Sequence, residues 1–301
     1  MVKRRILLIG SNGQIGWELW RCLQPLGQVF ALVREPNEHM AAYLDLTDPI
    51  SIREAVREVK PAVIVNAGAY TAVDKAEQEP ELAHAINGIA PGILAEEAHR
   101  LSALLVHYST DYVFDGQHTV PYVEHDTVNP LSVYGTSKLA GEEAIQAVGG
   151  HYLILRTAWI YGLRGKNFLL TVQRLARERS ELKIVNDQFG APTWSRLVAE
   201  TTAQIIAHIY SSLNDREMAG IGGIYHLTCA GQTTWYEFAQ AIVAQMERQP
   251  QVLPITTAEY PTPAKRPAYS VLANDKLANT FGLTMPAWDV ALELCLTSQE
   301  G

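Results

Sequence analysis

Tyr134 and Lys138 are the residues whose types and spacing most directly suggest chemistry. They stand four positions apart, so on a helix both side chains lie on one face. A lysine ammonium beside a phenol favours the phenolate, which predicts a tyrosine pKa lowered from about 10 toward neutrality. A phenol tuned in this way can exchange a proton with a carbonyl or carbinol oxygen. The alternative is an ordinary pair on an exposed helix.

A glycine loop near the start of the chain predicts nucleotide binding. An apolar run at residues 6–9 is typical of a buried strand, and Gly10, Gly13 and Gly16 follow it where a helix begins. Gly10 permits a tight turn, Gly13 lets the backbone approach a pyrophosphate, and Gly16 allows close packing of helix and strand. The helix N-terminus then binds the phosphates. A plain strand–helix turn is the competing interpretation.

The end of the second predicted strand, at residues 29–33, bears on the choice of cofactor. An acid there would hydrogen-bond the adenosine ribose and select NAD. Arg34 follows that strand instead, and its charge suits the 2′-phosphate of NADPH, while Glu35 keeps NADH as the alternative. Asp45, after the third predicted strand, is placed to meet the adenine amino group or to cap the next helix.

Two loops follow the carboxyl ends of later predicted strands, where ligands of parallel sheets lie. The small residues of the 66–71 loop, Asn-Ala-Gly-Ala-Tyr-Thr, let a cofactor pass close to the backbone. In the 107–116 segment, Thr110 supplies a hydroxyl that can donate to a substrate carbonyl oxygen beside the Tyr134 phenol. Two donors at one oxygen stabilise charge that develops there. Packing alone is the competing explanation for both loops.

Strands alternate with helices, which predicts βαβ units and an α/β fold with a doubly wound parallel (Rossmann) sheet. Asp48 and Pro49 suit the N-cap and first position of the helix that follows the third strand. Predicted strands lie at 6–9, 29–33, 43–44, 62–65, 104–108 and 152–155, and further helices at 80–100, 135–148, 167–179, 196–213 and 234–247.

The chain is expected to divide into two domains. Residues 1–155 form the dinucleotide-binding domain, to which some later segments return. Residues 156–301 form mostly a smaller substrate-binding domain, interrupted by proline-containing loops at 190–193, 250–254 and 261–267.

Composition excludes several classes of function. The 301 residues are 48% hydrophobic and 19% charged, which is typical of a folded globular protein. A net charge of −8 argues against nucleic acid as a partner. The longest apolar run falls short of the roughly 20 residues of a membrane helix, so no membrane partner is predicted. The three cysteines are far apart and suit reduced thiols in the cytoplasm.

Motifs along essentially the whole chain resemble the extended short-chain dehydrogenase/reductase superfamily and, within it, the dTDP-4-dehydrorhamnose reductase family. They are Gly-Ser-Asn-Gly-Gln-Ile-Gly at 10–16, Val-Asp-Lys-Ala-Glu at 73–77, Ser-Thr-Asp-Tyr-Val-Phe at 109–114, Tyr-Gly-x-x-Lys at 134–138, Arg-Thr-Ala-Trp-Ile-Tyr at 156–161, Asn-Asp-Gln-Phe-Gly-Ala-Pro-Thr at 186–193 and Tyr-Pro-Thr-Pro-Ala-Lys-Arg-Pro at 260–267. The 109–114, 186–193 and 260–267 motifs are the most specific.

The resemblance implies NAD(P)H-dependent reduction of the C4 ketone of a dTDP-linked 6-deoxy sugar. Carried over by position, the catalytic residues are Thr110, Tyr134 and Lys138. With Gly10 and Arg34 added from the patterns above, the cofactor-binding residues are Gly10, Gly13, Gln14, Ile15, Arg34, Asp45, Leu46, Ala69, Tyr70, Thr71, Tyr108, Tyr134 and Lys138. The substrate-binding residues are Thr110, Asp111 and Trp159.

The chain also departs from the family pattern. Relatives often carry an acid where Val33 stands, which favours NADPH here. Some relatives form dimers through a Mg²⁺ ion held by carboxylates, and one of these carboxylates falls near Arg196 in this chain. Glu18 alone cannot hold a metal, so we predict no metal site, and Mg²⁺ and a homodimer are left as open alternatives.

Four alternative functions are considered. A nucleotide-sugar dehydratase needs an Asp-Glu pair after the catalytic threonine, whereas Thr110 is followed by Asp111 and Tyr112. An epimerase would retain tightly bound NAD, and a reductase for another sugar nucleotide would share the same motifs. A relative of this family is a non-catalytic, NADP-binding regulatory subunit of methionine adenosyltransferase, and the intact catalytic set weighs against that function.

Overall fold

The computed structural model describes residues 4–35, 42–212 and 220–298. Its centre is a seven-stranded sheet in the order β11-β6-β5-β4-β1-β2-β3, in which every pairing is parallel. The strands are β1 (Arg5–Ile9), β2 (Gln28–Val33), β3 (Ala42–Tyr43), β4 (Val63–Asn66), β5 (Leu104–Thr110), β6 (Tyr152–Thr157) and β11 (Gly223–His226). The winding direction reverses between β1 and β4, where ligands of doubly wound sheets bind. The predicted fold class is confirmed.

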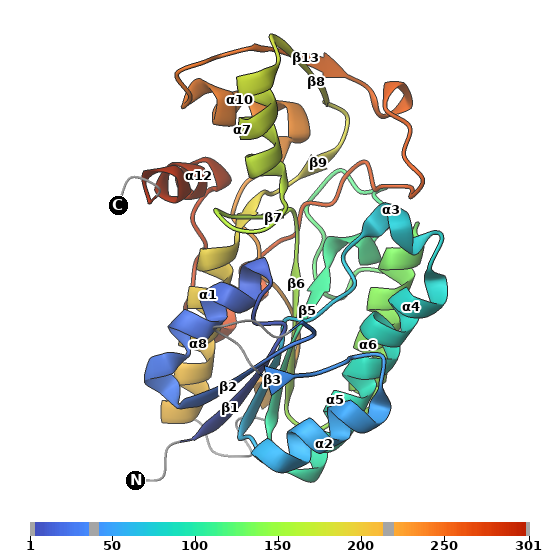
Figure 1. The fold of residues 1–301 in the computed structure, drawn as a ribbon, viewed down its shortest axis with the longest axis vertical. Coiled ribbons are helices and arrows are strands. Elements are labelled where there is room, and N and C mark those ends of the chain that lie inside the picture. The colour runs from blue at the N-terminus through green and yellow to red at the C-terminus, as the bar shows by residue number, and fades with distance from the viewer. Residues whose placement is uncertain (1–3, 36–41, 213–219, 299–301) are drawn as a thin grey trace.

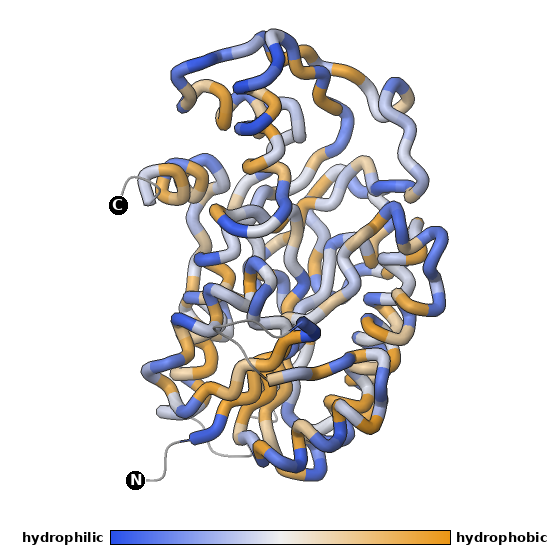
Figure 2. Tube along the Cα trace, in the orientation of Figure 1, coloured by the Kyte–Doolittle hydropathy of each residue, from blue (hydrophilic) through white to orange (hydrophobic). Residues whose placement is uncertain are grey.

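Both faces of the sheet are covered by helices (Figure 1). The first face carries α1 (Gln14–Cys22) and α8 (Ser195–Ser212), and the second carries α2 (Pro49–Val59), α5 (Ala90–Arg100) and α6 (Val133–Val148). Side chains alternate along each strand, so Ile6 and Leu8 pack on the first face while Leu7 and Ile9 pack on the second. Figure 2 shows the resulting concentration of hydrophobic residues in the strands.

A smaller group of elements lies beyond the carboxyl end of the sheet, at the top of Figure 1. It contains the helices α7 (Phe168–Glu178), α10 (Trp235–Ala244) and α12 (Trp288–Thr297), with a separate core built around Tyr161, Leu169 and Phe238. Its strand pairs are β8 (Glu181–Val185) with β13 (Gln251–Ile255), β7 (Ile160–Tyr161) with β10 (Thr193–Trp194), and β9 (Phe189–Gly190) with β12 (Thr233–Thr234). Further helices among the described residues are α3 (Val73–Ala76), α4 (Pro80–His84) and α11 (Asp275–Phe281).

Local signals predicted several boundaries well. The backbone N–H of Ile50 donates to the Asp48 carboxylate over 2.9 Å, and Pro49 opens α2, so the predicted cap is confirmed. The single helix predicted at 80–100 is instead α4 and α5 joined by a π-helical turn at Ala85–Ile89. The sequence gives no sign of this turn, because its buried residue Asn87 is fixed by contacts outside the helix.

The loop predicted at residues 250–254 is wrong, since β13 runs through it. Proline normally interrupts a strand because it cannot donate to the ladder. Here the Gln251 N–H donates to the Ser180 carbonyl and the Ile255 carbonyl accepts from the Asn186 N–H, just before and after β8, so Pro254, at the alternate position, faces the unpaired edge. A two-stranded ribbon leaves such an edge free, and the missing N–H costs nothing there.

Candidate active site

A cavity of about 660 Å³ opens at the carboxyl ends of the central strands, between the sheet and the smaller group of elements. This volume is within the usual range of ligand pockets, about 300–1,000 Å³. The predicted site residues that line it are Gly10, Gly13, Gln14, Ile15, Arg34, Asp45, Leu46, Ala69, Thr71, Tyr108, Thr110, Asp111, Tyr134, Lys138 and Trp159. The structure places Tyr70 and Glu35 outside this lining. The Tyr70 hydroxyl donates to Glu79 over 2.7 Å instead.

The glycine loop has the conformation that a close approach to phosphate requires. Gly10 has φ +77°, and a β-carbon on it would come within 2.6 Å of the Gly68 backbone nitrogen. A β-carbon on Gly16 would overlap the Gly10 carbonyl oxygen, so the predicted helix–strand packing is present. The uncharged first turn of α1, residues 14–17, leaves the positive end of the helix dipole facing the cavity. This loop fits a dinucleotide pyrophosphate.

Asp45 lies at the cavity wall with both carboxylate oxygens already engaged. Its Oδ1 accepts the backbone N–H and the hydroxyl of Thr47, each over 2.8 Å, and its Oδ2 accepts the Tyr43 hydroxyl over 3.4 Å. These bonds lower the pKa of Asp45, and the Arg34 guanidinium adds to the effect. The cap of α2 belongs to Asp48, so Asp45 shapes the preceding turn.

Tyr134 and Thr110 come from different elements and meet at the cavity. Thr110 is the last residue of β5, and Tyr134 stands in the first turn of α6, whose N-cap Ser132 accepts the Gly135 backbone N–H over 3.2 Å. The Thr110 hydroxyl donates to the Asp111 carboxylate over 3.0 Å and accepts the Tyr112 backbone N–H. The strand end therefore fixes a hydroxyl beside the phenol, as the sequence predicted.

The prediction that the pKa of Tyr134 is lowered is wrong. Burial raises the pKa of Tyr134 to about 12, and the adjacent Thr110 hydroxyl opposes the shift only in part. The Lys138 ammonium is directed elsewhere, since Nζ donates to the Tyr108 carbonyl over 2.6 Å and lies 3.3 Å from His107 Nε2. The phenol consequently stays protonated at neutral pH, which suits a proton donor.

Two other buried groups titrate near neutrality. Burial lowers the pKa of Lys138 to about 8, with the Glu142 carboxylate opposing the shift. Burial also raises the pKa of Asp111 to about 6, with the hydroxyls of Ser270 and Thr110 opposing. The cavity thus brings together the protonated phenol, a threonine hydroxyl, a carboxyl group and a lysine amino group. Groups of these types can transfer a proton to or from a substrate oxygen.

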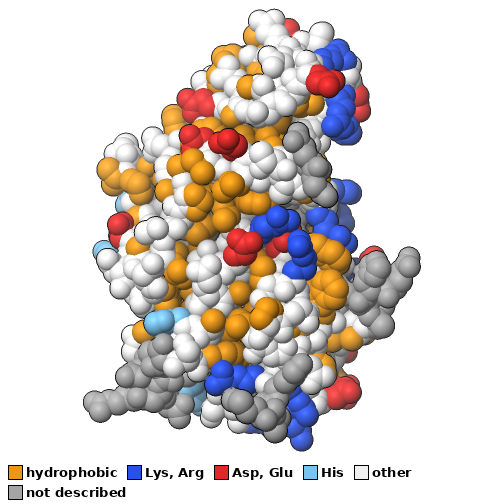
Figure 3. All heavy atoms as spheres, turned by 90° about the vertical axis from the view of Figure 1, so that its left-hand side faces the viewer, with side chains coloured by type: hydrophobic (Ala, Val, Ile, Leu, Met, Phe, Trp, Pro, Cys, Tyr) orange, Lys and Arg blue, Asp and Glu red, His pale blue; other side chains and the backbone are white. Residues whose placement is uncertain are grey.

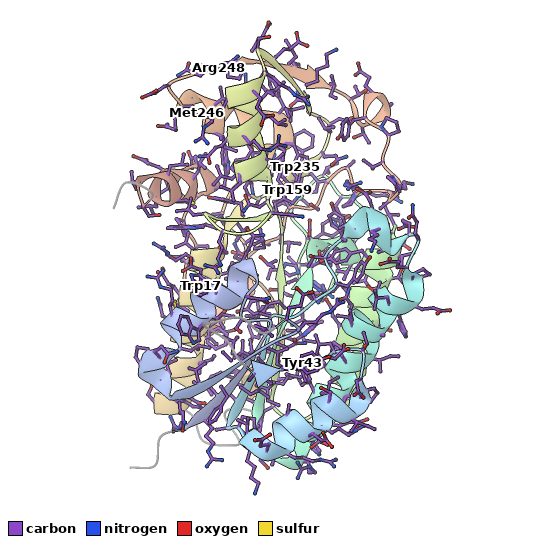
Figure 4. All side chains as sticks on the ribbon, in the orientation of Figure 1. Trp17, Tyr43, Trp159, Trp235, Met246 and Arg248 are labelled. Carbon is purple, nitrogen blue, oxygen red and sulfur yellow. The ribbon has the colours of Figure 1, made fainter. Side chains whose placement is uncertain are left out.

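An aromatic wall closes the cavity on the side of the smaller group (Figure 4). The Trp159 ring stacks on Trp235 with ring centres 3.5 Å apart and planes within 7° of parallel. Gly190 also lies against the Trp159 ring, and any β-carbon on Gly190 would overlap the Cε2, Cζ2 and Nε1 atoms of that ring. Trp159 has φ +47°, a left-handed conformation that is uncommon for a bulky residue and is often found at functional sites.

Several residues of the lining were not predicted from the sequence, including Trp235, Lys166 and Thr157. Lys166 could have been found, because it follows Gly165 in a loop rich in basic residues. Trp235 could not, because nothing local distinguishes it from a core residue of an amphipathic helix. Only the packing of α10 against the β6–β7 turn brings it to Trp159.

The 260–267 motif ties the C-terminal part of the chain to the sheet domain. The guanidinium of Arg266 contacts both carboxylate oxygens of Asp74, at 3.0 and 2.8 Å. The Ala264 backbone N–H also donates to Asp74. This ion pair anchors a loop near the cavity and lowers the pKa of Asp74.

Hydrophobic side chains gather on the face formed by α1, α8 and α12 (Figure 3). Val290 and Leu294 of α12 are among the exposed ones.

Glu18 lies in ion pairs with Arg196 and Arg21, each at 3.4 Å. Within residues 4–35, 42–212 and 220–298, no three His, Cys, Asp or Glu side chains are grouped to hold a metal. Those same ranges contain no helix long and apolar enough to cross a membrane.

Comparisons with known proteins place these features in context. The family model described as RmlD substrate binding domain matches residues 4–300. A dTDP-4-dehydrorhamnose reductase of Burkholderia thailandensis is 48% identical over 97% of this chain and 98% of its own. The enzyme of the same name from Escherichia coli K12 is 44% identical over 97% of this chain and 96% of its own.

Solved structures agree with the fold. The dTDP-4-dehydrorhamnose reductase of Bacillus anthracis in complex with NADP superposes with a TM-score of 0.87 at 35% identity, covering 99% of this chain and 100% of that one. A Thermus thermophilus UDP-glucose 4-epimerase with NAD gives a TM-score of 0.75 at 21% identity, covering 92% of this chain and 93% of its own. The second likeness concerns the fold alone.

Proposed function

This chain belongs to the RmlD substrate-binding family, whose curated relatives include dTDP-4-dehydrorhamnose reductases, and we propose that it reduces the C4 ketone of dTDP-4-dehydro-β-L-rhamnose to give dTDP-L-rhamnose. The protein is an oxidoreductase. One observation carries the proposal: Tyr134, Thr110 and Lys138 face the same cavity as the glycine loop.

NADPH is the proposed cofactor, and the residues present fit it. The N-terminus of α1 would hold the pyrophosphate, Arg34 the 2′-phosphate, and Lys138 the nicotinamide ribose hydroxyls. When bound, NADPH supplies the hydride that reduces the sugar carbon. The NADP complex of the Bacillus anthracis relative supports this choice.

In the proposed mechanism, Tyr134 donates its proton to the ketone oxygen as negative charge builds there. Its pKa, raised by burial to about 12, keeps the phenol protonated until that moment. Thr110 orients the carbonyl at the end of β5, and the charge of Lys138 stabilises the phenolate left behind. Asp111 and Trp159 contact the sugar nucleotide. Trp235 and Gly190 hold the Trp159 ring in its place at the cavity wall.

We further propose that residues 1–155 form the cofactor domain and residues 156–301 mostly the substrate domain. The exceptions are α8, β11 and α11, which pack on the sheet and belong with the cofactor domain. A cytoplasmic location is proposed because Cys22, Cys229 and Cys295 are free thiols.

The test of function is an assay of NADPH and NADH oxidation with dTDP-4-dehydro-6-deoxy sugar generated in situ. We expect oxidation of NADPH coupled to formation of dTDP-L-rhamnose, identified by mass and by NMR of the sugar. If the protein binds NADPH, does not reduce the sugar and is purified together with a stoichiometric partner protein, it would instead be a regulatory subunit. Protein that is purified with tightly bound NAD and interconverts sugars would be an epimerase.

Arg34→Ala is expected to shift the cofactor preference. Removing a charged donor to the 2′-phosphate costs about 1.5–3 kcal/mol, which corresponds to a rise of roughly 10- to 150-fold in the KM for NADPH. The KM for NADH should stay within about threefold, since NADH lacks that phosphate. Glu35→Ala is the matched control, because Glu35 adjoins Arg34 but lies outside the cavity lining. Equal losses with both cofactors would refute the assignment of Arg34.

A further inference from the structure

A chain of hydrogen-bonding groups runs beneath the cavity and ends at Lys138. The Gly68 backbone nitrogen lies 3.2 Å from Asn66 Oδ1, and Asn66 Nδ2 lies 3.1 Å from His107 Nδ1. On the other side of the ring, His107 Nε2 lies 3.3 Å from Lys138 Nζ. Asn66 and His107 are 1% exposed and lie outside the cavity lining, so water does not compete for their hydrogen bonds, whereas Lys138, 2% exposed, lines the cavity. The proposed mechanism leaves Asn66 and His107 unused.

The identity of the donors fixes the position of the imidazole proton. A backbone N–H can only donate, so the Asn66 oxygen faces Gly68 and the Asn66 amide N–H₂ faces His107. His107 Nδ1 must then accept. Burial and the adjacent Lys138 charge hold the pKa of His107 well below its usual range, so the ring is neutral. A neutral ring with an accepting Nδ1 carries its proton on Nε2.

That proton points at the amino group of Lys138. An ammonium has three donors and no acceptor, so it cannot pair with Nε2–H, whereas an uncharged amine accepts through its lone pair. The Tyr108 carbonyl accepts an N–H from Lys138 whether the lysine is charged or uncharged, so this hydrogen bond favours neither form. The hydrogen-bond chain therefore stabilises the uncharged form of Lys138.

The other charged and titratable groups around Lys138 act differently. On its own helix, Glu142 lies one turn further along and favours the ammonium. Arg156 of β6 neutralises much of that effect, because it is ion-paired with Glu142 at 2.6 Å. Tyr134, one turn earlier on α6, is protonated and uncharged. His107 is the group on β5 that faces the lysine, and its ring orientation sets the balance.

We propose that His107, held as the Nε2–H tautomer by Asn66, acts as a positioning residue that lets Lys138 release and regain its proton during turnover. The inference rests on the proposed function. After Tyr134 has given its proton to the ketone oxygen, Lys138 releases into the cavity the proton that restores the phenol, and becomes an amine. The Nε2–H of His107 stabilises that amine. Water returns a proton to Lys138 once the product has left.

Two features of the structure agree with this role. Burial already lowers the pKa of Lys138 to about 8, within reach of the solution pH, and the orientation of His107 acts in the same direction. The residues are also brought together by the sheet itself, since Asn66 and His107 are register partners on β4 and β5.

The tautomer is tested directly by NMR of the full-length protein labelled with ¹⁵N-histidine. The His107 signals are assigned by their loss in His107→Gln. We expect a neutral ring protonated at Nε2 from pH 6 to 9. A ring protonated at Nδ1, or a charged ring, would overturn the proposal. The spectrum needs no sugar substrate, so this outcome is independent of whether the sugar is reduced.

The effect on Lys138 is tested by titrating ¹³C-labelled lysine, with the Lys138 signal assigned through Lys138→Arg. In Asn66→Asp the carboxylate accepts from both Gly68 and His107 Nδ1–H, which turns Nε2 into an acceptor for the ammonium. In His107→Gln the side-chain carbonyl can accept likewise. Both variants should raise the Lys138 pKa by about one unit, the size expected for one net hydrogen bond.

His226→Gln is the matched control. His226 is also fully buried in a strand of the same sheet, but its Nδ1 contacts the Ala273 carbonyl oxygen over 3.1 Å rather than Lys138. Its replacement should leave the Lys138 titration unchanged. An unchanged Lys138 pKa in folded His107→Gln and Asn66→Asp would overturn the proposal.

Enzyme kinetics link the titration to turnover. The value of kcat/KM should fall as the pH rises past about 8, as Lys138 loses its proton. This fall should move upward with the lysine pKa in both variants, which a purely structural role would not cause. If the NMR shifts occur but the sugar is not reduced, the tuning of Lys138 stands and the proposed function fails.

Discussion

Replacement of Tyr134 by phenylalanine is expected to lower kcat by about 10²- to 10⁴-fold, the contribution of a positioned general acid. The change removes the one hydroxyl that gives its proton to the ketone and leaves the ring, which packs edge-on against Tyr112 with centres 5.8 Å apart. The affinities for NADPH and for the sugar nucleotide, measured by calorimetry, should stay within about threefold.

Tyr122→Phe is the control for this prediction. Tyr122 is fully buried, whereas Tyr134 is half-buried at the cavity, and the Tyr122 hydroxyl contacts Asp115 rather than the cavity, so kcat should be retained. A Tyr134→Phe enzyme that keeps its full rate would remove Tyr134 from the mechanism. The proposed reduction would then need a different proton donor.

Arg156→Met is expected to destabilise the fold by about 3–5 kcal/mol, because it strands the Glu142 carboxylate in the interior. The two residues are 2% and 0% exposed, and the guanidinium contacts Glu142 through Nε at 3.0 Å and Nη2 at 2.6 Å. Ser109 donates to the same carboxylate. The free energy of unfolding in urea, at constant slope, measures the loss.

The double variant Glu142→Met with Arg156→Met should recover most of that stability, since apolar residues of similar size replace a buried pair at little net cost. Arg174→Met provides the surface comparison. Arg174 pairs with Glu178 at 3.0 Å, but both side chains are more than half exposed, so the loss should be about 0–1 kcal/mol. Equal losses for Arg156→Met and Arg174→Met would show that burial of the first pair carries no extra cost.

The sequence by itself determined the elements whose signals are local. Short apolar runs gave the positions of β1 to β6 within a residue or two, and Asp48 with Pro49 marked the start of α2, whereas β11 of the same sheet was not predicted. The spacing of Gly10, Gly13 and Gly16 predicted a phosphate loop, and at Gly10 and Gly16 a β-carbon would indeed collide with nearby backbone atoms. Tyr134 and Lys138 could be paired because helical geometry places them on one face.

The tertiary structure alone decided what depends on burial and on contacts between distant segments. The Tyr134 pKa is raised rather than lowered, because desolvation outweighs a lysine whose ammonium is directed at β5. Trp235 reaches Trp159 only through the packing of α10, and Pro254 fits a strand only because the ribbon has a free edge. Desolvation and long-range juxtaposition are properties of the packed chain, and no short stretch of sequence contains them.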